Sequence, residues 1–146
     1  MIKIKKIKQN IISINNSIFA KIESNLSSIY LLSARLWIAN VFFKSGKNKL
    51  DNMDSTIYLF EYEYVVPLFS PVFAAYSSTF FELACPIFLA LGLLSRLATL
   101  PLIAITLMIQ FFVLQNVDHY YWLFLLFVVF VFGGGKASAD KFLKLK

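Results

Sequence analysis

The chain has 146 residues, of which 59% are apolar and 16 are phenylalanine, and its formal net charge is +6. A soluble domain of this size could not bury so many large apolar side chains in one core, whereas lipid accepts an apolar surface. The basic residues gather at the two ends and in two loops, without an interleaved aromatic surface, which excludes a nucleic-acid-binding protein.

Residues 1–25 form a basic tail with two open interpretations. Its apolar residues recur at steps of three or four, which places them on one face of a helix. One interpretation is therefore a basic amphipathic helix on the inner leaflet of a membrane. The other is a frayed tail rich in lysine, asparagine and serine. The residues of the stripe are Ile4, Ile7, Ile11, Ile14, Ile18, Ile22 and Leu26.

Four apolar runs follow the tail, at residues 26–43, 71–94, 97–114 and 120–132. A membrane-spanning helix needs roughly 20 mostly apolar residues. The fourth run is short, but the glycines of 133–135 extend it, and the aromatic residues of 120–122 are typical of a membrane interface. We therefore predict an all-α membrane protein, with a four-helix transmembrane bundle over residues 26–135 and a basic tail over 136–146. The longest connection, residues 45–70, is expected to begin with a turn at Gly46, Asn48, Asp51 and Asn52.

Lysine and arginine residues predict the orientation of the bundle. With four spans, both basic tails and Arg96 fall on one side, while the lysines of 44–49 on the other side are diluted by acidic residues. The positive-inside rule then places both termini in the cytoplasm. We expect a multi-pass protein of the bacterial plasma (inner) membrane, in contact with membrane lipids.

Two charged residues lie near the middle of apolar runs, Arg35 in the first and Glu82 in the second. A charge at the bilayer centre costs at least about 2.5–3.5 kcal/mol on insertion scales, so such residues face the bundle interior and pair. We predict a buried Arg35–Glu82 ion pair. The pair either fixes the register of two helices or anchors a polar pocket for a redox-active or protonatable ligand.

Other polar groups are candidates for the same pocket. Gln110 lies in the outer half of the third run, where it either joins the pocket or makes a contact between helices. His119, beside Asp118, is expected at the outer interface near Lys49. The single cysteine, Cys85, shares a helical face with Glu82, so it is either a reactive thiolate or a small packing residue. One histidine with scattered carboxylates does not make a metal site, so we predict no metal.

Four short motifs follow one another at matching depths in the predicted bundle. They are Arg35-Leu36 with Gly46-Lys47-Asn48-Lys49-Leu50, Glu82 with Leu91-Gly92-Leu93 and Arg96-Leu97-Ala98, Ile109 to Val113 with His119 and Trp122, and Gly133-Gly134-Gly135 with Ser138 and Asp140. Together they resemble the DoxX family of small four-span membrane proteins over residues 32–142. Ala137 and Ala139 are smaller than the residues expected at their positions in the family's terminal signature.

The resemblance implies a redox role near the quinone pool, as a subunit or accessory of a membrane redox system with a partner protein. It does not supply a catalytic mechanism, so enzymatic activity stays open, and an active protein would be an oxidoreductase subunit. The ligand expected in the pocket is a quinone head group. A non-enzymatic assembly factor or scaffold, and a small transporter or proton pathway, are the alternatives.

Overall fold

The computed structural model describes the backbone of residues 2–64 and 69–144, and the side chains of residues 17, 19, 20, 22–64 and 69–144. All secondary structure within these residues is helical, which confirms the predicted all-α class. The helices are α1 (Ile2–Asp51), α2 (Met53–Tyr62), α3 (Pro71–Leu91), α4 (Ser95–Phe112), α5 (Val117–Phe132) and α6 (Ala139–Phe142).

Three stretches are long and apolar enough to cross a membrane: Ile22–Asp51 within α1, Pro71–Leu91 and Ser95–Phe112. Helix α5 is apolar but shorter, at 16 residues. At 1.5 Å per residue it measures about 24 Å, less than the roughly 30 Å of a hydrocarbon core. The fold is thus that of a helical membrane protein, and a fourth span stays a prediction.

Helix α1 is longer than the first apolar run. It continues through Gly46 to Asp51, so the turn predicted at the start of the 45–70 connection is wrong, and the chain turns only at Asn52. Gly46 has another use, because a Cβ at this position would lie 2.9 Å from the carbonyl carbon of Glu82. The missing side chain lets α1 approach the backbone of α3 closely.

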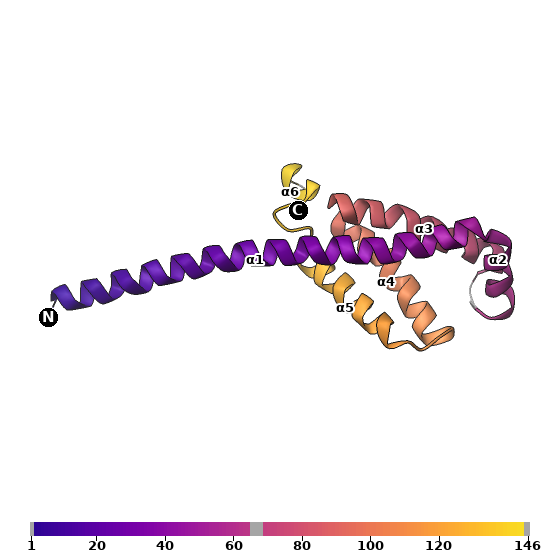
Figure 1. Ribbon diagram of the computed structural model, residues 1–146, viewed down its shortest axis with the longest axis horizontal. Coiled ribbons are helices and arrows are strands. Elements are labelled where there is room, and N and C mark those ends of the chain that lie inside the picture. Colours follow the sequence, from indigo (N-terminus) through magenta and orange to yellow (C-terminus); the bar gives the residue numbers. More distant parts are fainter. Residues whose placement is uncertain (1, 65–68, 145–146) are drawn as a thin grey trace.

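Towards its N-terminus, α1 projects well beyond the other helices (Figure 1). Its backbone is helical from Ile2, continuous with the part that packs in the bundle. The isoleucine stripe of the predicted amphipathic helix lies almost entirely among side chains outside the described set. Its described members, Ile22 and Leu26, are exposed.

The ends of α3 and α4 follow from local chemistry. Ser70 caps α3 by accepting a hydrogen bond from the Phe73 amide at 3.4 Å, and Pro71 occupies the first turn, where a missing N–H costs nothing. Gly92 ends α3 in the left-handed conformation (φ 68°). The chain therefore reverses within three residues, and α3 and α4 form a tight antiparallel hairpin.

The bundle core lies between α1, α3, α4 and α5. Helix α1 packs mainly along α3, and α4 packs mainly along α5. One apolar cluster joins all four helices, and its members are Ile38, Ala39, Phe42, Cys85, Leu89, Ala98, Leu102, Leu126 and Val129. Most other large apolar side chains are exposed, as expected of helices that face lipid.

Candidate functional site

The predicted Arg35–Glu82 ion pair is wrong. Glu82 pairs with Lys49, and Lys49 Nζ lies 2.5 Å from Glu82 Oε1. Arg35 donates instead to backbone carbonyls, from Nη2 to Ala137 at 2.7 Å and from Nη1 to Leu89 at 3.3 Å. Both charged side chains are buried, as predicted, but at different depths of the bundle.

The register of α1 against α3 explains the difference. Gly46 faces Glu82, while Arg35 faces Gly92, where an added Cβ would clash with Arg35 Nη1. Arg35 and Gly46 are 11 residues apart, which corresponds to about 16 Å along a helix. An Arg35 side chain cannot reach a carboxylate at that distance.

In the Lys49–Glu82 pair, the glutamate is buried and the lysine is partly exposed. The Glu82 side chain is 1% exposed and that of Lys49 is 17% exposed. The second carboxylate oxygen, Oε2, is buried and has no hydrogen-bond partner; among the described side chains, Arg35 Nε and Ser95 Oγ are in the same state. A buried acceptor without a donor is costly.

Gln110 and His119 form a second polar pair. His119 Nδ1 lies 2.7 Å from Gln110 Oε1, which also accepts a hydrogen bond from the Asn116 amide at 3.1 Å. The backbone donor identifies this atom as the amide oxygen, and an oxygen of this kind only accepts. Nδ1 therefore carries the proton, and in the neutral ring Nε2 is an acceptor.

Helix α2 and the α4–α5 turn lie at one end of the bundle (Figure 1). Lys49 is in the last turn of α1, directly before α2, and Gln110 and His119 lie on either side of the α4–α5 turn. Trp122 connects their surroundings, because its ring centroid lies 5.1 Å from that of His119 and 5.8 Å from that of Phe42. Phe42 is one helical turn before Gly46, which touches Glu82. We call Lys49, Glu82, Gln110 and His119 the two polar pairs. Trp122 was expected in an interfacial belt and in a motif with His119, but not among the site residues. Its spacing of three residues from His119 places both rings on one helical face.

The remaining candidates have simpler surroundings. Cys85 is 6% exposed and belongs to the apolar core cluster, so it packs between helices. Asp118 is exposed and lines an open groove between α1 and α5 with Trp37, Tyr121, Trp122, Phe124 and Leu125. Within the described residues, no group of three or more histidine, cysteine, aspartate or glutamate side chains could hold a metal ion.

The opposite end of the bundle is closed by the segment after α5. In this segment the Ala137 carbonyl accepts a hydrogen bond from Arg35. The backbone amide of Asp140 donates to Gly92 O at 2.9 Å. The Asp140 carboxylate accepts from the amides of Leu94 at 2.6 Å and Ser95 at 2.9 Å. A carboxylate here satisfies free N–H groups at the start of α4 and suits the positive end of its dipole.

Glycines make room for this closure. A Cβ on Gly134 would lie 2.5 Å from that of Ser138, a buried residue whose hydroxyl donates to Gly135 O at 2.7 Å. The terminal motif therefore folds back onto Arg35 instead of starting a free tail. We call Arg35, Gly92, Gly134, Ser138 and Asp140 the Arg35 clamp, a feature that the sequence motifs did not predict as a contact.

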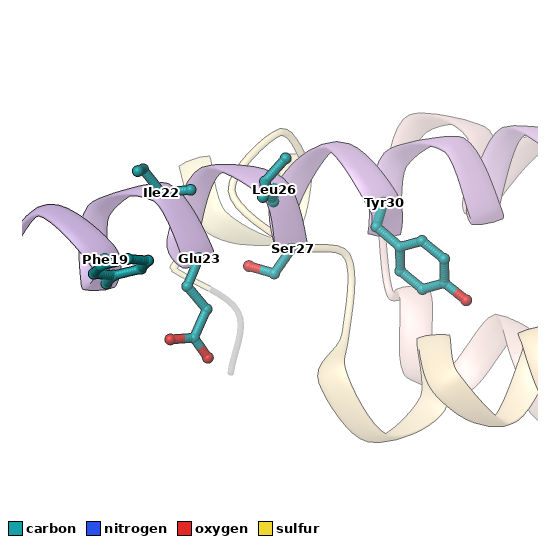
Figure 2. A pocket seen from close by; sticks show the side chains of 6 residues that line it. All are labelled: Phe19, Ile22, Glu23, Leu26, Ser27 and Tyr30. Carbon is teal, nitrogen blue, oxygen red and sulfur yellow. The ribbon is translucent and has the colours of Figure 1, made fainter.

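A second hollow lies on the part of α1 that projects beyond the bundle. Figure 2 shows its six lining side chains, which all come from this one helix: Phe19, Ile22, Glu23, Leu26, Ser27 and Tyr30. They point to different sides of the helix, and all six are exposed. A hollow lined by one helix does not enclose a ligand, so the two polar pairs are the stronger candidate site.

Comparison with known proteins gives one match. The DoxX family model matches residues 30–115, which is more than half of the chain and includes Arg35, Lys49, Glu82 and Gln110. No curated protein matches. No solved structure matches either.

Proposed function

The chain belongs to the DoxX family and is a multi-pass membrane protein, and from this premise we propose that it is a subunit or accessory of a membrane redox system near the quinone pool. The observation that carries the proposal is the buried Lys49–Glu82 pair with its unpartnered oxygen. In this proposal the unpartnered oxygen of Glu82 accepts a hydrogen bond from the polar head group of a bound ligand.

The residues present fit a quinone head group. A quinone bound here would supply two-electron redox chemistry. Lys49 can donate hydrogen bonds to the oxygens of either redox form, and Glu82 Oε2 and the free ring nitrogen of His119 can accept hydrogen bonds from the hydroxyls of the reduced form. Exposed aromatic and apolar side chains around α5 would leave the isoprenoid tail in lipid.

The proposal includes a topology. Helices α1, α3, α4 and α5 would form four spans in a bacterial plasma membrane, with both termini in the cytoplasm. The Arg35 clamp would then lie near the cytoplasmic face and the two polar pairs nearer the outer face. In this arrangement residues 1–25 form a basic cytoplasmic segment that is available to a partner protein or to lipid, residues 26–135 form the bundle, and residues 136–146 return to the cytoplasm.

The test replaces the whole pair while preserving volume. In a Lys49→Met/Glu82→Leu double variant no charge is left unpaired, and such replacements of buried ion pairs are often neutral for stability. We expect the variant to fold and to lose binding of a short-chain benzoquinone, in both redox states, measured by calorimetry on protein in lipid nanodiscs. The matched control is Lys47→Met/Glu61→Leu, because both of these residues are exposed.

A second candidate function, a non-enzymatic assembly scaffold, is favoured by the Arg35 clamp. There a buried charge binds only backbone carbonyls and serves architecture. If wild-type protein binds neither redox form of the benzoquinone, the quinone proposal is wrong. A folded double variant that also sustains quinone reduction in membranes as well as wild type would make the scaffold the better account.

A further inference from the structure

We propose that the site at Glu82 selects the reduced, hydroxyl-bearing form of its ligand, the hydroquinone, over the oxidised quinone. This inference rests on the proposed function and adds the redox state that the site recognises. It follows from the chemistry of the one buried polar side-chain atom at this end of the described structure that lacks a partner, Glu82 Oε2.

The unpartnered atom is an acceptor. Glu82 Oε1 lies 2.5 Å from Lys49 Nζ, so the two side chains form an ion pair of a carboxylate and an ammonium group. An ionised carboxylate has no hydrogen to donate. The group that satisfies Oε2 must therefore bring an O–H or N–H.

Lys49 does not impose the opposite requirement. Its remaining N–H donors belong to a side chain that is 17% exposed, whereas the Glu82 side chain is only 1% exposed. Water at the surface can satisfy the lysine without any ligand. The pair therefore lacks a hydrogen-bond donor to Glu82 Oε2. A ligand that carries only carbonyl oxygens cannot supply this donor.

His119 has the same preference. Because Nδ1 donates to Gln110 Oε1 at 2.7 Å, Nε2 of the neutral ring carries a lone pair. Two separate groups at this end of the bundle are therefore acceptors. A hydroquinone offers two hydroxyl donors, while a quinone offers two further acceptors, which would leave a buried carboxylate oxygen unpaired.

The experiment compares the two redox forms of one ligand on the full-length protein. A short-chain benzoquinone and its hydroquinone are titrated anaerobically into protein in nanodiscs. An unmet buried hydrogen bond corresponds to roughly a 5- to 150-fold difference in affinity, so we expect wild type to bind the hydroquinone at least about tenfold more tightly.

Glu82→Gln provides the sharper test. A glutamine side chain can turn its NH₂ group to the position of Oε2 and so offers a donor where the wild type offers an acceptor. We expect the preference for the hydroquinone to vanish or reverse in this variant. Glu61→Gln, which makes the same change at an exposed position of α2, should keep the wild-type ratio.

The outcomes separate the two proposals. Equal or tighter binding of the quinone by wild type overturns the redox selectivity and leaves the quinone site standing. Binding of neither form overturns the proposed function itself, and Oε2 is then the site of a water molecule. The wild-type ratio decides the selectivity even if Glu82→Gln does not fold.

Discussion

Arg35 and Glu82 are both buried charged residues on facing helices, and the bundle accommodates them in different ways. Arg35 meets two backbone carbonyls of its own chain, one from α3 and one from the segment after α5. Glu82 meets a single ammonium group and keeps one oxygen without a partner. Each of the two residues keeps one buried atom without a partner, Nε of Arg35 and Oε2 of Glu82, but only Glu82 is paired with a side chain that reaches the surface.

This difference suggests separate roles for the two ends of the bundle: Arg35 fixes the arrangement of the helices, and Glu82 takes part in ligand binding. Arg35, whose two terminal nitrogens donate to backbone carbonyls while its Nε has no partner, stabilises one arrangement of the helices. A buried charge with an unused oxygen costs stability, and such costs are typical of functional sites. Substitutions at the two ends should therefore change different measured quantities.

The largest effect is expected from Arg35→Ala. It removes the donors to the Ala137 and Leu89 carbonyls and leaves a cavity, which together should lower the free energy of unfolding by about 3 kcal/mol. Thermal unfolding of the purified protein, followed by circular dichroism, measures the loss. Arg96→Ala is the control, since Arg96 is exposed and donates one hydrogen bond, to Val131 O. Equal losses from both substitutions would show that the clamp has no special role.

An intermediate effect is expected from Gly46→Ala, which connects the two ends. The added Cβ would lie 2.9 Å from the Glu82 carbonyl carbon, so α1 and α3 must separate by a few tenths of an ångström. We expect a loss of about 2 kcal/mol in stability, together with weaker hydroquinone binding, because Lys49 moves with α1. Ser45→Ala controls for the change at the neighbouring position. Unchanged binding in folded Gly46→Ala protein would contradict the role given to this close approach.

The smallest effect is expected from Asp140→Asn. The Leu94 and Ser95 amides donate to different oxygens of Asp140, so asparagine keeps an acceptor for only one of them and loses the charge at the start of α4, which should cost about 1 kcal/mol. Hydroquinone binding should not change, because the clamp lies at the far end of the bundle. Asp118→Asn, at the start of α5, is the matched control. A change in the hydroquinone preference of Asp140→Asn would show that the two ends are not separate.

The sequence predicted the helical class and the helices α1, α3, α4 and α5 of the bundle, because their apolar runs are long, but it did not predict the short helices α2 and α6. It placed Arg35 and Glu82 in the interior correctly, since a charge inside a long apolar run has few alternatives. The predicted pairing of Arg35 with Glu82 was wrong. Each residue lies near the middle of its apolar run, and both were therefore assumed to lie at the same depth in the membrane. Depth depends on the register of α1 against α3, and that register is fixed by contacts such as Gly46 on Glu82.

Gly46 shows why the end of α1 was also predicted wrongly. A glycine followed by asparagine and aspartate residues is typical of a turn, and only the neighbouring helix reveals that the glycine is needed for close packing. The Arg35 clamp was missed for a similar reason. Arg35 and Ala137 are 102 positions apart in sequence, and nothing local to Ala137 or Asp140 indicates an arginine partner.

Helix α1 carries both Arg35 and Lys49 on one uninterrupted rod, 14 residues apart, or about 21 Å. Both side chains are carried by the same helix, so the distance between the clamp and the Lys49–Glu82 pair is set by the helical rise. The single register of α1 against α3 therefore positions both contacts.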